Sequence, residues 1–178
     1  MNVYDFDKTI FYPDSSFKFI KFALKKNPRI VFKIIPKLIN AQGTAEIKEA
    51  FFYTIRYIPD IDALVDKFWD KHFDRILPWY LKRRKSDDVI VSASPEFLIK
   101  VAACRLGVRF IATPMNKYSG KIMGMNCHDI EKVRRFKAEY PDQKIENFYS
   151  DSLSDAPMAE LAERAFIVNK GKVKDWPK

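Results

Sequence analysis

Two patterns of hydrophobic and polar positions alternate along this chain. Residues 1–12 and 86–178 contain short runs of β-forming residues, separated by helical or turn segments. Residues 13–85 instead repeat apolar positions at helical spacing, as in Phe17, Ile20 and Leu24. This alternation predicts an α/β fold, a Rossmann-like parallel sheet with a helical insertion after the first strand. The β-rich runs are Val3-Tyr4, Val89-Ile90-Val91, Phe110-Ile111-Ala112, residues 145–149 and Ala165-Phe166-Ile167-Val168.

Local signals define two further elements within residues 86–178. Ser94 and Pro95 are the expected N-cap and first helical residue of a helix that covers about residues 96–106 and ends at Gly107. Residues 115–124, with Ser119-Gly120 at their centre, predict a hairpin that projects from the sheet.

The positive charge is concentrated in the helical insertion. The 178 residues carry 32 Lys or Arg and 23 Asp or Glu, a net charge of +9. Residues 13–85 hold 16 of these cations against 8 acids, and residues 13–48 hold 8 against 2. Such a segment either meets an anionic partner or is a solvated helix face, and both interpretations stay open. No nucleic-acid-binding motif accompanies the charge, so nucleic acid is not an expected partner.

Several features predict a cytoplasmic protein. The first residues lack the basic region and the cleavage site of a secretory signal. The two cysteines, Cys104 and Cys127, lack the spacing of a zinc site or a disulfide framework. Seven cations interrupt the longest apolar stretch, residues 17–39, so no transmembrane span is expected. Peripheral contact with the inner face of the membrane is the alternative.

Two pairs of acids follow predicted strands. Asp5 and Asp7 come at the end of the first run, and Asp151 and Asp155 follow the fourth. Ligands bind at the carboxyl edge of such sheets, so the two pairs are expected to meet there. Carboxylates this close repel one another unless a hard cation lies between them, and oxygen ligands alone favour Mg²⁺. Ser92 adds a hydroxyl at the same edge, where backbone N–H groups can face an anion.

Taken in order, these residues resemble the four motifs of the haloacid dehalogenase superfamily of aspartate-nucleophile phosphatases. The resemblance is to the phosphoserine-phosphatase-like branch with a helical cap. Further matches are Ser92-Ala93-Ser94-Pro95-Glu96, Asn126-Cys127 and residues 151–158. The resemblance implies a catalytic core of residues 1–12 and 86–178 and a cap of residues 13–85. The motif residues are Asp5 and Asp7, Ser92, Lys132, and Asp151 with Asp155.

The resemblance also implies a role for each motif residue. Asp5 is the expected nucleophile, and Asp7 the general acid–base group, which favours a phosphatase over a dehalogenase. Mg²⁺ is expected on Asp5, the backbone carbonyl of Asp7 and Asp151, with Asp155 in support. Ser92 and Lys132 are expected to bind the phosphoryl oxygens. His128, four residues before Lys132, is not assigned a catalytic role, and His72 is expected at the surface or in packing.

The chain departs from the family pattern at two positions. Lys8 stands where many members have glycine, and Ser150 stands where glycine often precedes the metal-binding aspartate. Neither change removes a reacting group. Lys8 adds a cation beside the expected nucleophile.

Three functions remain open from the sequence. The first is a Mg²⁺-dependent phosphatase for a small phosphorylated metabolite, with phosphoserine as one example. The second is the same chemistry on a membrane lipid phosphate, because residues 14–36 also resemble bacterial phosphatidylglycerophosphate phosphatases. The third is a non-catalytic basic module that binds anionic surfaces.

The basic segment allows two structural hypotheses. In one, the helix containing Phe17, Phe19, Ile20, Phe22 and Leu24 docks on an anionic membrane through these side chains and its lysines. In the other, the apolar side chains of this helix are buried in the cap and the lysines only keep it soluble.

Overall fold

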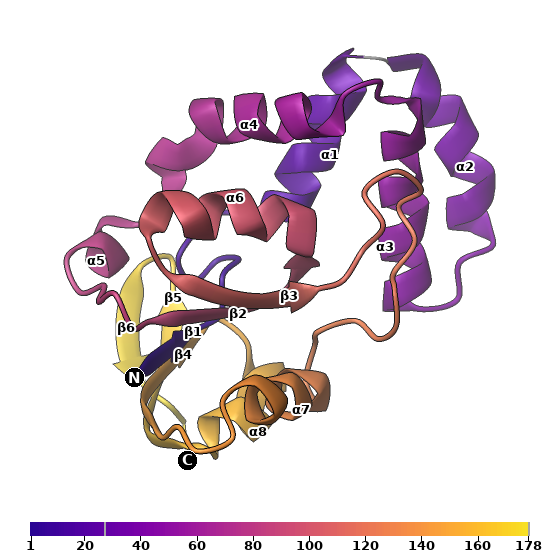
Figure 1. Ribbon diagram of the computed structural model, residues 1–178. Coiled ribbons are helices and arrows are strands. Elements are labelled where there is room, and N and C mark those ends of the chain that lie inside the picture. Colours follow the sequence, from indigo (N-terminus) through magenta and orange to yellow (C-terminus); the bar gives the residue numbers. More distant parts are fainter. Residues whose placement is uncertain (27, 178) are drawn as a thin grey trace.

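A computed structural model of the protein describes residues 1–26 and 28–177. A succession of helices follows the first strand, and strands and helices alternate from residue 89 to residue 169 (Figure 1). The strands are β1 (Asn2–Tyr4), β2 (Val89–Pro95), β3 (Arg109–Thr113), β4 (Ile145–Ser150), β5 (Ala162–Asn169) and β6 (Lys172–Asp175). The helices are α1 (Ser15–Lys26), α2 (Val31–Ile39), α3 (Thr44–Phe52), α4 (Ile61–His72), α5 (Pro78–Leu81), α6 (Glu96–Leu106), α7 (Ile130–Glu139) and α8 (Ala156–Ala159).

The strands form one sheet in the order β3-β2-β1-β4-β5-β6. All neighbouring strands are parallel except β6, which is antiparallel to β5. The predicted α/β fold and its five strands are confirmed. The sequence analysis missed β6, although Lys170 and Gly171, both with positive φ, form a tight turn before it.

Helices cover both faces of the sheet (Figure 1). Val3 and Tyr4 of β1 point to opposite faces, because side chains alternate along a strand. Tyr4 joins the hydrophobic cluster beneath α1, α4 and α6. Val3 joins a second cluster with Val133 of α7 and Met158 of α8. The two clusters hold β1 at the centre of the sheet, so its carboxyl end lies in the middle of one edge.

Helix α6 spans the predicted residues, but its N-terminus differs from the prediction. The N-cap is Pro95, not Ser94, and Glu96 is the first helical residue. The Ser94 hydroxyl is engaged by another side chain, Asp7, and does not cap the helix. At the other end, Gly107 closes α6 in the left-handed conformation, as predicted.

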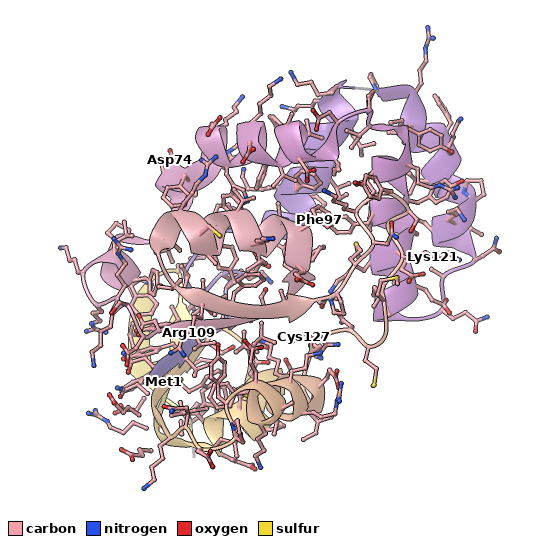
Figure 2. All side chains as sticks on the ribbon, viewed as in Figure 1. Met1, Asp74, Phe97, Arg109, Lys121 and Cys127 are labelled. Carbon is pink, nitrogen blue, oxygen red and sulfur yellow. The ribbon has the colours of Figure 1, made fainter. Side chains whose placement is uncertain are left out.

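The cap helices pack their apolar residues against α6. On α1, Phe19 and Ile20 are buried in the core cluster, whereas Phe17 is 62% exposed. The ring of Phe97 on α6 lies 6.0 Å, centroid to centroid, from Phe19 and from Phe52 of α3 (Figure 2). Because Phe19 and Ile20 pack inside the protein, they are not available for insertion into a membrane, which argues against docking through the apolar face of α1.

The last part of the predicted cap contacts the core sheet. The Leu77 N–H donates a hydrogen bond to the Ile10 carbonyl at 2.7 Å. The ring of Tyr80 lies 4.9 Å from that of Tyr4, and Trp79 lies 5.4 Å from Tyr149. Residues 77–80 thus pack on β1 and β4, and the division of core and cap at residue 85 stays a prediction. His72 packs against Phe68, in agreement with its predicted role.

Residues 115–124 form the expected hairpin, with Met115 bridged to Ile122. The hairpin rests on α3, where the Ile122 N–H donates a 2.7 Å hydrogen bond to the Glu49 carboxylate. Gly120 has a φ of +74°, and a Cβ at this position would lie 2.3 Å from the Phe52 carbonyl oxygen. Only glycine allows the hairpin to approach α3 this closely.

We therefore expect Gly120→Ala to destabilise the protein more than Gly107→Ala, the matched control. Both residues have φ near +70°, but a Cβ on Gly107 meets no atom within 4 Å. The control loses about 1–2 kcal/mol from the left-handed conformation alone, and Gly120→Ala about 2–4 kcal/mol because overpacking adds to it. Urea denaturation measures both values. Equal losses would show that the hairpin can leave α3 freely.

Candidate active site

The carboxyl ends of β1, β2 and β4 meet around a cavity of about 300 Å³. Residues that are up to 150 positions apart in the sequence line this one cavity. The cavity contains every residue that the sequence analysis assigned to the site: Asp5, Asp7, Ser92, Lys132, Asp151 and Asp155.

A buried lysine lies at the centre of these acids. Lys132, at the start of α7, is only 2% exposed, and its Nζ donates hydrogen bonds to Asp5 Oδ1 at 2.5 Å and Asp155 Oδ2 at 2.8 Å. Burial opposes the charge on Lys132, but the two carboxylates outweigh this effect and raise the pKa of the ammonium. Lys132 is therefore a fixed cation beside Asp5.

Asp5 remains in an environment unfavourable to negative charge despite this pairing. Burial raises the pKa of the Asp5 carboxyl, Lys132 lowers it, and Asp155 and Asp151 raise it again. Asp5 Oδ1 accepts a hydrogen bond from Lys132, whereas Oδ2, among the described residues, has only a long 3.5 Å contact from the Thr9 hydroxyl. Asp5, which lines the cavity, therefore has one carboxylate oxygen without a strong hydrogen bond.

Asp7 is held by donors from two separate elements. The Ser15 N–H at the start of α1 donates to Asp7 Oδ1 at 2.5 Å, and the Ser94 hydroxyl donates to Oδ2 at 2.5 Å. Burial raises the pKa of Asp7 to about 6, with Asp14 adding to the effect. A carboxyl with a raised pKa can carry a proton near neutral pH. The sequence did not indicate this role for either serine: Ser94 was predicted as a helix cap, and Ser15 had no predicted role.

The donor set of the site fits a hard cation. Five aspartates and three lysines line the cavity, and of these lysines Lys132 is fully buried, so acids exceed cations. Asp155 Oδ2 accepts hydrogen bonds from Lys132 and, at 2.6 Å, from the Ser150 hydroxyl. Asp5, Asp151 and the Asp7 carbonyl remain as available oxygen ligands. Within residues 1–26 and 28–177, no three His, Cys, Asp or Glu side chains already converge at metal-binding distances.

Lys48 is a site residue that the sequence analysis did not identify. It comes from α3 of the cap, and its Nζ donates to the Ala93 carbonyl and to Asn126 Oδ1, both at 2.6 Å. Burial lowers the pKa of Lys48 to about 8, although Asp7 and Asp14 oppose this shift. No spacing in the sequence pairs residue 48 with residues 93 and 126. Only the packing of the cap on the core brings them together.

Ser92 and His128 occupy different depths of the cavity. Ser92 is 1% exposed, and its hydroxyl oxygen accepts the Ser94 N–H at 3.0 Å, so its proton is free to be donated into the cavity. His128 precedes α7 and contacts the Ser154 hydroxyl at 3.4 Å at the rim of the site. Since α7 begins at Ile130, His128 does not share a helical face with Lys132.

The backbone conformation of Lys8 explains why many members of the resembled family have glycine at this position. Its φ is +59°, in the left-handed region, and its N–H donates to the carbonyls of Phe11 at 2.6 Å and Pro13 at 2.9 Å. This tight turn places Asp5 and Asp7 at the cavity while the chain reverses toward α1. The turn forms with lysine at the cost of backbone strain.

Comparisons with known proteins agree with this site. The model of the haloacid dehalogenase-like hydrolase family matches residues 3–160. The chain therefore belongs to the haloacid dehalogenase-like hydrolases, and the predicted family and enzyme class are confirmed. A comparison with curated protein sequences finds no match.

Solved structures share the fold at low sequence identity. A protein of unknown function from Bordetella pertussis is 18% identical, with a TM-score of 0.74 over 93% of this chain and 87% of that one. A phosphoserine phosphohydrolase-like protein from Francisella tularensis is 17% identical, with a TM-score of 0.57 over 93% and 86%. A phospho-aspartyl intermediate analogue of phosphoserine phosphatase is 17% identical, with a TM-score of 0.54 over 92% and 83%. The fold is that of phosphoserine-phosphatase-like members of the family.

We expect Lys8→Gly to stabilise the protein. Glycine removes the left-handed strain of about 1–2 kcal/mol but loses about 0.5–1 kcal/mol to the greater freedom of the unfolded chain. The free energy of unfolding should therefore rise by roughly 0.5–1 kcal/mol. Chemical denaturation tests this, with Lys67→Gly within α4 as a control that must destabilise. A loss of stability in Lys8→Gly would show that the lysine side chain makes a compensating contribution.

Proposed function

We propose that the protein hydrolyses phosphomonoesters through a phosphoryl group carried on Asp5. The observation that carries this proposal is the contact between Lys132 and Asp5 in a cavity that also holds Asp7. A carboxylate nucleophile, a fixed cation and a second carboxyl with a raised pKa are the groups that two-step phosphoryl transfer requires.

In the first step, an Asp5 oxygen attacks the phosphorus atom and the bond from phosphorus to the leaving oxygen breaks. Asp7 donates its proton to that leaving oxygen, so the alcohol departs neutral. Lys132 and the Ser92 hydroxyl bind phosphoryl oxygens and offset their charge. Asp155 and Ser150 position Lys132 for this contact.

In the second step, water attacks the phosphorus of the aspartyl-phosphate. Asp7, now ionised, accepts a proton from this water, and the bond between phosphorus and the Asp5 oxygen breaks. Inorganic phosphate leaves and the Asp5 carboxylate is restored. The hydrogen bonds from Ser15 and Ser94 keep Asp7 oriented through both steps.

The residues assigned to Mg²⁺ are Asp5, Asp151 and the backbone carbonyl of Asp7. When bound, the ion would neutralise phosphoryl charge in addition to Lys132. Asp155 keeps its predicted supporting role, and Asp7 contributes its backbone carbonyl and not its carboxylate. Asp155 holds Lys132, and the Asp7 carboxylate is held by Ser15 and Ser94.

The size and charge of the cavity favour a small phosphorylated metabolite as substrate. A volume of about 300 Å³ is at the lower end for ligand pockets. Lys48 and Asp14 line its cap side, so the leaving group meets one cation and one anion there. A polar metabolite that carries both charges suits this arrangement, as phosphoserine would.

The two alternative functions, a lipid phosphatase and a non-catalytic module, predict different results in an assay of phosphate release. A lipid phosphatase would differ only in the leaving group, so a screen of phosphorylated metabolites and phospholipids distinguishes it. A non-catalytic module would release no phosphate from any ester. A cytoplasmic location stays a prediction, with both cysteines free thiols.

We expect Asp5→Asn to abolish turnover, because an amide does not form the aspartyl-phosphate. Asp7→Asn should slow hydrolysis by about 10²–10⁴-fold, the usual contribution of a general acid–base group. Release of phosphate from an aryl phosphate measures both, with the exposed Asp142→Asn as a control. Near wild-type turnover by the Asp5 variant would place the nucleophile elsewhere.

We further expect chelation to abolish activity and added Mg²⁺ to restore it. Asp151→Ala removes one hard oxygen ligand and should raise the Mg²⁺ concentration needed for half-maximal activity. Asp142→Ala leaves that concentration unchanged in the same titration. Full activity in excess chelator would rule out the metal assignment.

A further inference from the structure

Helix α2 presents an apolar face to solvent. Of its nine residues, only Ile34 is buried. Residues three or four positions apart share one face of a helix, and such spacings connect four large apolar side chains of α2. They are Val31, Phe32, Ile35 and Ile39, which are 38%, 76%, 44% and 76% exposed.

Such a face needs an explanation. Single exposed apolar residues are ordinary, but a contiguous apolar patch on a monomer usually marks an interaction site. Helix α1 differs from α2 in this respect, because Phe19 and Ile20 of α1 are buried against the core. Among the residues that the structure describes, none buries the outer face of α2.

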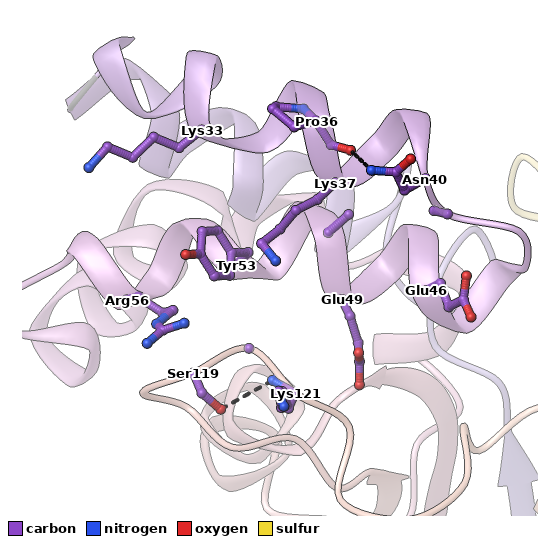
Figure 3. Close-up of a pocket in the computed structure, with 13 residues that line it drawn as sticks. Lys33, Pro36, Lys37, Asn40, Glu46, Glu49, Tyr53, Arg56, Ser119 and Lys121 are labelled. Atoms are coloured by element: carbon purple, nitrogen blue, oxygen red, sulfur yellow. Dashed lines mark hydrogen bonds between the residues drawn. The ribbon is translucent and has the colours of Figure 1, made fainter.

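Cations lie on the side of α2 opposite this apolar face. Lys33 and Lys37 of α2, Arg56 and Lys121 line a cleft of about 700 Å³ between α2, α3 and the hairpin (Figure 3). Lys37 Nζ lies 4.2 Å from the centre of the Tyr53 ring. None of the four cations forms an ion pair within the described ranges of the chain.

The acids of the cleft are already engaged. Glu46 accepts a hydrogen bond from the Gln42 N–H and Glu49 from the Ile122 N–H, each at 2.7 Å. The four cations therefore exceed the two acids, and both acids contact backbone donors. The flank of α2 is positively charged and available to an external anion.

We propose that α2 docks the protein on an anionic lipid bilayer. Phe32, Ile35 and Ile39 enter the boundary between headgroups and acyl chains, while Lys33 and Lys37, on the polar side of the helix, attract the anionic headgroups. None of the helices in the described part of the chain has the length and hydropathy to cross a bilayer, so the contact lies in the plane of the interface.

Charge selects this occupant over a second copy of the chain. The protein carries a net charge of +9, and pairing two α2 faces would bring like charges together. An anionic bilayer offers both an apolar layer and compensating phosphates to the same helix. This docking does not depend on catalysis, so it stands or fails apart from the proposed hydrolysis.

Cosedimentation with vesicles tests the proposal. Wild-type protein should bind vesicles of phosphatidylglycerol and phosphatidylcholine at low salt, bind less at moderate salt, and not bind phosphatidylcholine alone. Phe32→Ser with Ile39→Ser should weaken binding about tenfold or more, because two inserted side chains are lost. The matched control is Phe17→Ser with Met123→Ser, which removes two equally exposed side chains elsewhere.

A second pair of variants tests the charge. Lys33→Glu with Lys37→Glu should abolish vesicle binding, whereas Lys21→Glu with Lys25→Glu on α1 should weaken it far less. All four double variants should keep wild-type turnover of an aryl phosphate, which shows that they fold. Absence of turnover in every protein, with docking intact, would count against the proposed hydrolysis alone.

Three results would overturn docking through α2. One is no binding of wild-type protein to anionic vesicles at low salt. Another is equal loss in the α1 and α2 charge variants, which would indicate attraction by net charge without a defined face. The third is a dimer in solution, measured by light scattering, that Phe32→Ser with Ile39→Ser dissociates, since a second copy would then cover the face.

Discussion

The site depends on one buried ion pair network, in which Lys132 bridges Asp5 and Asp155. A buried ammonium is expensive to desolvate, and removing either partner would leave an uncompensated charge. The network therefore requires the end of β1, the start of α7 and the turn after β4 to meet at one point. Ser150 adds a hydrogen bond to Asp155 and secures the third of these elements. The sheet order, with β1 between β2 and β4, provides that meeting point.

The cap completes the site as well as covering it. Ser15 on α1 donates to Asp7, and Lys48 on α3 reaches two oxygens of the core loops. Glu49, the next residue on α3, holds the hairpin that follows β3. Helix α3 thus contacts the cavity and the hairpin through adjacent residues, so its position affects both. A shift of α3 would move Lys48 away from the leaving group of the proposed reaction, so under this proposal the geometry of the cap affects the choice of substrate.

The positive charge of the cap has different surroundings on its two basic helices. Helix α1 buries its apolar face and leaves lysines on the solvated side, as ordinary surface helices do. Helix α2 leaves its apolar face in solvent and carries Lys33 and Lys37 on its opposite side. Both segments have similar composition, so the difference arises from which face each helix turns toward α6 and the core. This is why the docking hypothesis moves from α1 to α2.

The sequence by itself determined the α/β class, five of the six strands and helix α6, because local periodicity and turn residues are written along the chain. The resemblance of its motifs to a known family indicated the six motif residues that lie at the cavity. Tertiary structure alone decided that Ser94 binds Asp7, that Lys48 enters the site and that α2 remains uncovered. The two contacts join residues about 45 to 90 positions apart. No local pattern encodes which distant surfaces will pack together or stay uncovered, because packing selects among many faces of similar composition.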